Sequence, residues 1–206
     1  MLSSRDERRR HYDTYTAHIH DLCHTPAIRR TLEKGRGRPV SDCPDLIRYL
    51  AQPTRHHYGR RAHYTVASLI ARQYPRHQQH PDDPNTTPST PHKEASSGDS
   101  TESQDPLARW NRRPNLGTTL ACAVHAGDLS ENTTPRQLRS ITRLSENLLH
   151  PRLFSLTRQL AQAGHTVDFA VLLEDLVQWP EDRPRVTQRW LTGYYLALPV
   201  PTSELR

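Results

Sequence analysis

Apolar residues along this chain recur every three or four positions, which is the period of an amphipathic α-helix, and nowhere alternate convincingly as in a strand. The spacing predicts an all-α fold of about nine short helices in two packed groups. Four helices are expected before residue 75 and five after residue 115. The expected ranges are 5–22, 26–34, 44–50, 60–74, 116–126, 134–147, 151–163, 169–176 and 184–196.

Local signals mark several of the expected helix starts. Ser4 followed by Glu7 has the pattern of a capping box, and Asp168 stands where it can cap the helix that follows it. The apolar face of each helix predicts the core of the protein. His63 and Trp190 are expected to lie in that core.

The segment from Arg76 to Asp105 contains no Leu, Ile, Val or Phe and consists largely of Pro, Ser, Thr, His and Asp. A segment of this composition has too little apolar surface to bury, so it predicts a long, disordered, acidic linker. The expected organisation is an N-terminal helical group at 1–75, a linker at 76–109 and a C-terminal helical group at 110–198.

Several classes of protein are excluded by what the sequence lacks. No run approaches the about 18 apolar residues that a membrane span needs, and the first residues lack the apolar stretch of a secretory signal. Three widely spaced cysteines argue against a disulfide framework. We therefore expect a soluble, reduced, cytoplasmic protein with no membrane partner.

The positive charge of the chain is carried mostly by arginine. The formal net charge is +6, and 26 of the 28 basic residues are arginine. The first 75 residues carry a net +7 and residues 106–206 a net +3, while residues 76–105 carry −4. A guanidinium binds phosphate oxygens in pairs and stacks on bases, so the balance favours a nucleic-acid partner, although a G+C-rich genome also favours arginine.

Three of the expected helices have a basic face opposite their apolar face. Such faces are ordinary on solvated helices, and Arg29 and Glu33 are spaced as a simple ion pair. Three of them together nevertheless predict one continuous surface that follows a phosphate backbone. The residues concerned are Arg136, Arg139 and Arg143 in 134–147, Arg29, Arg30 and Lys34 in 26–34, and Arg61 and Arg72 in 60–74.

Two connectors between helices add basic groups. The segment from Lys34 to Pro39 contains two glycines, which let its backbone approach a phosphate closely. Its centre looks like an AT-hook. Two interpretations of this segment stay open: a motif that binds the DNA minor groove, and a basic loop without that role. The connector from Arg55 to Arg61 mixes histidine and tyrosine with arginine, as single-strand binding requires.

No constellation of residues indicates catalysis. There is no P-loop, no nucleophile elbow and no two-glycine phosphate turn, so neither a catalytic residue nor a cofactor is expected. Three histidines lie close to Cys23, but no second pair of ligands follows them, so no metal site is expected. Glu174 and Asp175 are interpreted as part of a solvated helix face.

Six segments in a fixed order carry a family resemblance. They are Ala27–Arg30, Asp45–Leu50, Asn115–Gly117, Arg136–Leu144, Leu153–Leu160 and Val167–Trp179, followed by a last helix with Trp190. In order and spacing they resemble the CasB family, the small subunit of the type I-E CRISPR Cascade surveillance complex. Residues 76–105 and the segment Arg36–Pro39 depart from the family pattern.

The resemblance implies a non-catalytic subunit that braces the guide RNA–target DNA heteroduplex and holds the displaced strand in a basic groove without reading its sequence. The implied partners are guide RNA, target DNA, the backbone and large subunits of Cascade and a second copy of the chain. The DNA duplex and the guide–target heteroduplex that replaces it are nearly equal in stability, so protein contacts to the nucleic-acid backbone can favour the heteroduplex. The implied phosphate contacts are Arg29, Arg30, Arg139 and Arg143, with Arg136, Lys34, Arg36 and Arg38 as secondary ones.

Two other functions stay open. One is a helix-turn-helix DNA-binding regulator built from 134–147 and 151–163, although its turn lacks the usual glycine and its second helix offers only Arg152 and Arg158. The other is a helical protein–protein adaptor whose charge serves solubility.

Overall fold

The computed structural model describes residues 4–74 and 106–198, and these residues form helices and no β-strand. The all-α prediction is confirmed, whereas residues 76–105 of the expected linker lie outside the described residues. The helices are α1 (Arg5–Cys23), α2 (Pro26–Glu33), the 3-10 helix η1 (Val40–Asp42), α3 (Pro44–Leu50), α4 (Arg60–Gln73), α5 (Pro106–Arg112), α6 (Leu116–His125), α7 (Thr134–Thr142), α8 (Glu146–Gln162) and α9 (Phe169–Ala197).

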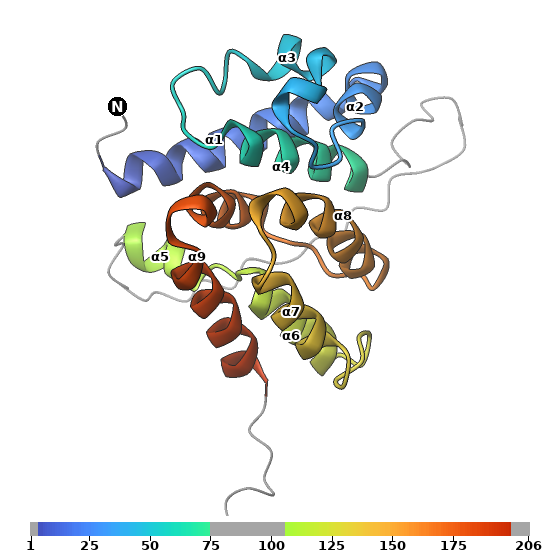
Figure 1. Ribbon diagram of the computed structural model, residues 1–206, viewed down its shortest axis with the longest axis vertical. Helices are drawn as coiled ribbons and strands as arrows, with labels where there is room; N and C mark the ends of the chain where they lie inside the picture. The colour runs from blue at the N-terminus through green and yellow to red at the C-terminus, as the bar shows by residue number, and fades with distance from the viewer. Residues whose placement is uncertain (1–3, 75–105, 199–206) are drawn as a thin grey trace, which may run out of the picture.

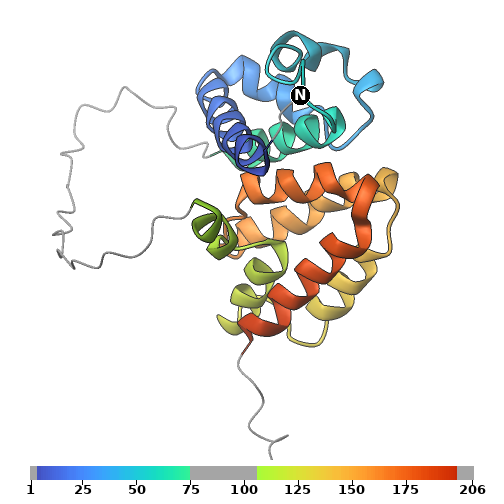
Figure 2. The ribbon, with the colours of Figure 1, turned by 90° about the vertical axis from the view of Figure 1, so that its left-hand side faces the viewer.

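The helices form two layers (Figure 1, Figure 2). Helices α1 to α4 make the upper layer in Figure 1, and α5 to α9 make the lower one. The layers share one core, because α9 packs against α1 and α4, and α8 packs against α4. Ile19, Val66, Leu172 and Trp190 are buried in this core, as the apolar spacing predicts. His63, which the sequence also assigns to the core, is fully buried.

Both predicted N-caps are present. The Ser4 hydroxyl accepts a hydrogen bond from the Glu7 N–H, and the Glu7 carboxylate accepts one from the Ser4 N–H. Asp168 accepts hydrogen bonds from the N–H groups of Ala170 and Val171 at the start of α9. These bonds satisfy donors that the first turn of a helix leaves without an intrahelical partner.

Helix α6 approaches α9 closely because a glycine lies between them. A Cβ atom on Gly117 would lie 1.8 Å from the carbonyl oxygen of Trp190. Only glycine therefore allows this separation of the two backbones. The contact fixes the second half of α9 against α6.

The boundary between α7 and α8 differs from the prediction. Helix α7 ends at Thr142 and α8 begins at Glu146, so the turn expected at 148–150 lies inside α8. Pro151 has the pattern of a helix start, because proline is favoured at the first position, but here it lies within the helix. Ser145, with an extended backbone, is the N-cap instead.

Helix α9 is kinked at Asp182, where φ of −141° and ψ of 58° leave the helical region. Pro180 and Pro184 flank the kink, and each lacks the N–H that a continuous helix uses. Asp182 then caps the second half by accepting a hydrogen bond from the Arg185 N–H at 3.2 Å. The two helices expected at 169–176 and 184–196 are the two halves of this element.

Helix α5 begins inside the range expected for the linker. Pro106 occupies its first position, where the missing N–H costs no hydrogen bond. The last four residues of the expected linker range, 106–109, thus form the start of this helix.

Two findings bear on the classes that the sequence excludes. None of the helices in the described part of the chain combines the length and the apolar character that crossing a bilayer requires. Cys23, Cys43 and Cys122 are all free thiols, in agreement with the argument against a disulfide framework.

Candidate nucleic-acid interface

The basic loop after α2 is held in an unusual backbone conformation. Arg36 has a φ of 43°, in the left-handed region that few residues other than glycine adopt, and Gly37 follows with a φ of 71°. A Cβ atom on Gly37 would lie 2.6 Å from the backbone carbon of His150, so glycine lets the loop lie against α8. Arg38 donates to the Lys34 carbonyl oxygen at 3.1 Å. The loop is therefore fixed on α8 rather than free.

Arg61 of α4 joins this loop to α8. Its Nη1 donates to the side-chain oxygen of Asn147, and its Nη2 donates to the carbonyl oxygens of Gly37 at 3.2 Å and Asn147 at 3.4 Å. The Asn147 carbonyl accepts this bond because Pro151, four residues later in α8, has no N–H to occupy it. Arg61, predicted as a phosphate contact, thus has a structural role as well.

A neutral histidine is buried beneath this contact. His150 Nδ1 lies 2.7 Å from the Thr65 hydroxyl, in the core between α4 and α8. Burial, followed by the nearby charge of Arg61, lowers the pKa of His150 to about 3. His150 is therefore neutral at pH 7, and the positive charge here belongs to arginines alone.

A groove of about 510 Å³ beside α8 is lined by three arginines, which come from three elements. They are Arg36 of the loop, Arg72 of α4 and Arg158 of α8. A second hollow of about 270 Å³ shares Arg72, Phe154 and Arg158 with the first. No acidic residue of the described chain lines either hollow. We call the two together the arginine groove, and its unbalanced positive charge favours an anion.

The sequence indicates the members of the arginine groove only in part. Arg36 and Arg72 are basic surface residues in the prediction, whereas Arg158 enters it only as a possible contact of a helix-turn-helix protein. The signal that was available is the outward position of Arg158 on α8. That α4 and α8 pack side by side is a tertiary fact that helical spacing does not contain.

Helix α2 exposes only part of its predicted basic face. Arg30 and Lys34 are exposed, and Lys34 Nζ lies 3.8 Å from an Asp45 carboxylate oxygen in an exposed ion pair. Arg29 is only 6% exposed and lies 3.9 Å from Glu33. The expectation that Arg29 points outward is wrong. The reason is geometric, since position 29 lies only about 60° around the helix from the buried position 32.

Helix α7 carries its predicted stripe on the surface. Arg136, Arg139 and Arg143 are exposed, and Arg139 donates to the Tyr195 hydroxyl at 3.1 Å, so the stripe runs beside the end of α9. The stripe approaches the basic loop at its Arg143 end. Arg143 lies four positions before Asn147, the partner of Arg61, so their Cα atoms are at most about 14 Å apart.

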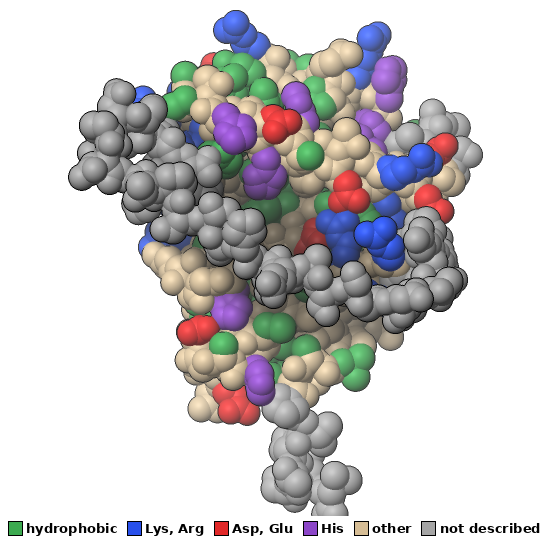
Figure 3. Space-filling view, turned by 180° about the vertical axis from the view of Figure 1, so that it is seen from behind, with side chains coloured by type: hydrophobic (Ala, Val, Ile, Leu, Met, Phe, Trp, Pro, Cys, Tyr) green, Lys and Arg blue, Asp and Glu red, His purple; other side chains and the backbone are tan. Residues whose placement is uncertain are grey.

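The continuous line expected through Arg29, Arg30, Arg139 and Arg143 is wrong. Both ribbon views place α2 in the upper layer and α7 in the lower one, and Arg29 is buried (Figure 1, Figure 2). Figure 3 shows the face opposite to that of Figure 1, where Lys and Arg side chains on the visible part lie in separate places beside acidic and histidine side chains. The basic surface therefore consists of separate patches. The arginine groove is a patch to which α4, α8 and the loop after α2 each contribute an arginine.

Glu174 and Asp175, interpreted from the sequence as solvated, are 2% and 0% exposed. That interpretation is wrong, because guanidinium and indole N–H groups from α1, α5 and the second half of α9 enclose the two carboxylates. The donors, at 2.6 to 3.1 Å, are Arg9, Trp110 and Arg189 for Glu174, and Arg189 and Trp190 for Asp175. We call this cluster the carboxylate junction. It joins α1, α5 and both halves of α9.

The two carboxylates of the junction titrate differently. Burial alone would raise the pKa of Glu174, but the hydrogen bond from Trp110 and the charges of Arg189 and Arg9 bring it below its ordinary value. Burial raises the pKa of Asp175 to about 6, against the opposing effects of Arg189 and Trp190. The charges of the junction are satisfied within the fold, so it is not a candidate binding site.

Two further observations concern metal ligands and tryptophans in the described part of the chain. Within residues 4–74 and 106–198, no group of three or more His, Cys, Asp or Glu side chains is arranged to hold a metal ion. Trp110, Trp179 and Trp190 are all buried, so none offers the exposed tryptophan that a protein partner would contact.

Comparisons with known proteins agree with this architecture. A chain of a solved "CRISPR RNA-guided surveillance complex" is 25% identical, with a TM-score of 0.71 over 97% of this chain and 99% of that one. A Cse2-family protein of Thermus thermophilus is 19% identical, with a TM-score of 0.60 over 90% and 98% of the two chains. CasB of M. ruber is 20% identical, with a TM-score of 0.58 over 84% and 85%. The last two show the fold.

The sequence comparison identifies the family. No curated protein matches the chain, but the family model of the CRISPR-associated protein Cse2 matches residues 29–195, which is most of the chain. The resemblance to CasB proteins stated from the sequence is confirmed. The chain therefore belongs to the Cse2, or CasB, family of CRISPR-associated proteins.

Proposed function

We propose that this chain is the small, non-catalytic subunit of a CRISPR Cascade surveillance complex in antiviral defence. In this role it binds the backbone of the guide RNA–target DNA heteroduplex and of the displaced strand. The setting is supported by the likeness, over 97% of this chain, to a chain of a CRISPR RNA-guided surveillance complex. The observation that carries the binding role is the arginine groove, where Arg36, Arg72 and Arg158 face one hollow.

Arginines placed in this way suit binding that does not depend on sequence. Phosphate contacts fix position and carry no base information, and guide–target pairing supplies the specificity. The exposed Arg30, Arg38 and the α7 stripe extend the cationic surface beyond the groove. The other proposed partners are the backbone and large subunits of Cascade and a second copy of the chain.

A salt titration tests the binding role. The full chain is titrated with a labelled RNA–DNA heteroduplex, and log K is followed against log salt. The triple variant R36A/R72A/R158A should lower the slope by about 2 to 3, because each lost phosphate contact removes about 0.9 from it. Its affinity at about 100 mM salt should fall roughly 10- to 100-fold, as expected for three lost charge contacts.

The matched control removes the same charge elsewhere. R48A/R109A/R183A takes three exposed arginines from α3, α5 and α9, which share no hollow. Its slope should stay within about 1 of the wild type. Equal losses in both triple variants contradict the proposal, and so does a lack of heteroduplex retention at about 50 mM salt, which favours the adaptor. A large preference for one defined DNA duplex favours the regulator.

A further inference from the structure

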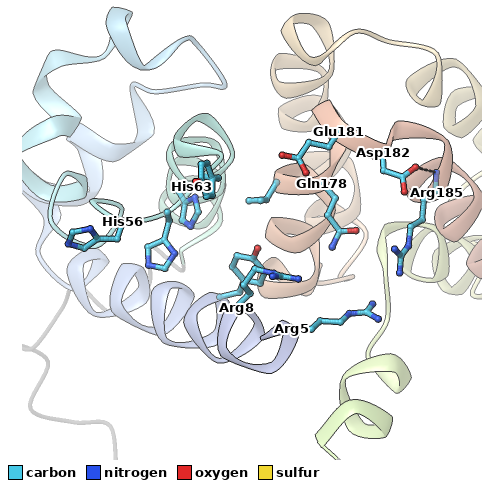
Figure 4. Close-up of a pocket in the computed structure, with 12 residues that line it drawn as sticks. Arg5, Arg8, His56, His63, Gln178, Glu181, Asp182 and Arg185 are labelled. Carbon is cyan, nitrogen blue, oxygen red and sulfur yellow. Dashed lines mark hydrogen bonds between the residues drawn. The ribbon is translucent and has the colours of Figure 1, made fainter. Parts of the chain in front are cut away.

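A separate cavity of about 520 Å³ lies between α1, the connector before α4 and the kink of α9 (Figure 4). Its volume falls within the roughly 300–1,000 Å³ of small-molecule sites. We call it the kink cavity. The side chains that matter for its chemistry are Arg5 and Arg8 of α1, His57 and Tyr58 of the connector, and Glu181 and Arg185 of α9.

The connector provides an aromatic wall. Tyr58 is 78% exposed and makes no hydrogen bond with any described residue. The ring of the neighbouring His57 is stacked on His11, with ring centroids 3.3 Å apart and planes at 9°. A large ring left in solvent at the edge of a cavity is a surface on which a nucleobase stacks.

Two histidines beside this wall, His11 and His63, are neutral at pH 7. His63 Nδ1 lies 3.0 Å from the Gly59 carbonyl oxygen, which only accepts, so Nδ1 carries the proton and donates. His63 Nε2 therefore accepts from His11 Nε2, 3.0 Å away. Burial lowers the pKa of His63 to about 4 and that of His11 to about 3. His11 and His63 therefore add no positive charge here at pH 7, and the fixed positive charge of the cavity is that of its arginines.

Arginines from two helices face the kink cavity. In Figure 4, Arg5 and Arg8 extend from α1 toward α9, and Arg185 lies opposite them. The guanidinium groups of Arg8 and Arg185 form no hydrogen bond or ion pair with the described residues. A neighbouring groove of about 680 Å³ shares Arg5 and Arg185 with the cavity, and the described residues that line it include no acid. A chain of phosphates can therefore run from the cavity along this groove.

Glu181 adds an acceptor at the opposite wall. It is exposed, points into the kink cavity from α9 and has no hydrogen-bond or ion-pair partner among the described residues. A carboxylate accepts from the exocyclic amino group of cytosine, whereas thymine and uracil carry no amino group. This wall therefore distinguishes bases, which the arginine groove does not.

We propose that the kink cavity receives one extruded nucleotide of a single-stranded nucleic acid. Its base stacks on Tyr58, its amino group donates to Glu181, and the flanking phosphates lie on Arg5, Arg8 and Arg185. The proposal rests on the proposed function and deepens it, because it adds a base contact to phosphate binding. It also gives a role to the aromatic and basic connector from Arg55 to Arg61.

Binding of homopolymers by the full chain tests the cavity. Labelled dC12, dT12, rC12 and rU12 are titrated at about 100 mM salt, and anisotropy gives each Kd. The wild type should bind the cytosine oligomers about 5-fold or more tightly than their partners, and the DNA and RNA pairs tell which strand it prefers. Tyr58→Ala should weaken dC12 binding roughly 5- to 100-fold, the range for loss of a stacked base, while Tyr58→Phe keeps it.

The second variant separates base recognition from charge. Glu181→Ala removes a negative charge, so it should bind dT12 at least as tightly as the wild type while losing the preference for dC12. A purely electrostatic role for Glu181 would tighten both equally. Tyr195→Ala, another exposed tyrosine at the far end of α9, is the matched control and should leave the preference unchanged.

Each outcome of these titrations either supports or contradicts the cavity proposal. Equal affinities of the wild type for dC12 and dT12, or a Tyr58→Ala variant that binds like the wild type, overturn the cavity proposal, while salt-dependent binding leaves the arginine groove in place. Absence of binding to every oligomer and to the heteroduplex overturns the proposed function as well. Should Tyr58→Ala lose its helical circular dichroism, the dC12 preference of Glu181→Ala settles the question.

Discussion

The carboxylate junction and the arginine groove both join helices that are far apart in the sequence, but they use arginine in opposite ways. In the junction, Arg9 and Arg189 are matched to two buried carboxylates. In the groove, Arg36, Arg72 and Arg158 line a solvent-open hollow without acidic neighbours among the described lining residues. One set completes its ion pairs inside the protein, and the other leaves positive charge for a partner.

A basic composition therefore does not by itself locate a binding surface. A buried ion pair is costly to break, because the partner that remains is held in a low-dielectric interior. An exposed arginine on a helix contributes little to stability, and most of its free energy of interaction is available to a ligand. Measurements of unfolding and of binding therefore separate the two regions.

The largest effect is expected from breaking the junction. Asp175→Ala leaves the Trp190 indole N–H without its acceptor, and it removes the shorter of the two carboxylate contacts of Arg189, so that only Glu174 remains. The free energy of unfolding should fall by about 3–5 kcal/mol, the range for one partner removed from a buried pair. Urea unfolding followed by circular dichroism measures it.

The groove supplies the control for this variant. Arg158→Ala removes an exposed charge and should change the free energy of unfolding by no more than about 0.5 kcal/mol. If Asp175→Ala and Arg158→Ala destabilise the fold to the same extent, the distinction between a structural and an available set of arginines is lost.

A somewhat smaller effect is expected from acid. Burial lowers the pKa of His63 to about 4 and that of His150 to about 3. Below about pH 6.5 these histidines therefore bind protons in the unfolded chain but stay neutral in the folded chain. Stability should therefore fall as the pH falls from about 6.5 to about 4. Asp175 acts in the opposite direction, because its raised pKa of about 6 lets the folded state bind a proton. His11, whose pKa is also lowered to about 3, acts in the same direction as the other two histidines, so the net effect of acid should be a loss of stability.

Unfolding midpoints between about pH 7 and pH 4 test the acid effect. His63→Asn keeps a donor for the Gly59 carbonyl oxygen but does not titrate, so its stability should depend less on pH than that of the wild type. His18→Asn makes the same change at an exposed histidine and is the matched control for the substitution itself. Binding in the arginine groove should keep its salt slope over the pH range in which the chain stays folded, because arginine does not titrate there.

Local signals predicted the parts of the fold that depend on a few neighbouring residues. The Ser4–Glu7 box and the Asp168 cap bind donors within three residues, so the sequence contains their whole geometry. Trp190 falls on the apolar side of a regular helix, which is enough to place it in the core. The all-α class follows from the same period.

The parts that failed depend on partners far along the chain. Burial of Glu174 requires Arg9 and Trp110, which are 165 and 64 residues away. Pro151 has the pattern of a helix start because it cannot donate to the carbonyl oxygen of Asn147. The sequence does not show that Arg61, from the other layer, donates to this oxygen instead. The arginine groove likewise needs the packing of α4 on α8. Charge and periodicity predict which residues are basic but not which basic residues meet.

The smallest and most local contrast is between two adjacent arginines of α2. Arg29 is buried beside Glu33, whereas Arg30 is exposed. Arg29→Ala should lower the free energy of unfolding by about 1–2 kcal/mol through lost packing and charge contacts, and Arg30→Ala by less than about 0.5 kcal/mol. Thermal unfolding of the two variants side by side measures this difference.

Binding should show the reverse order for the same pair. Arg30 lies one helical turn before Lys34, at the edge of the basic loop, so Arg30→Ala should lower the salt slope for the heteroduplex by up to about 1. Arg29→Ala should leave that slope unchanged, because its guanidinium is turned toward Glu33. A slope that falls in Arg29→Ala and holds in Arg30→Ala would mean that burial does not tell a structural arginine from a phosphate contact in this protein.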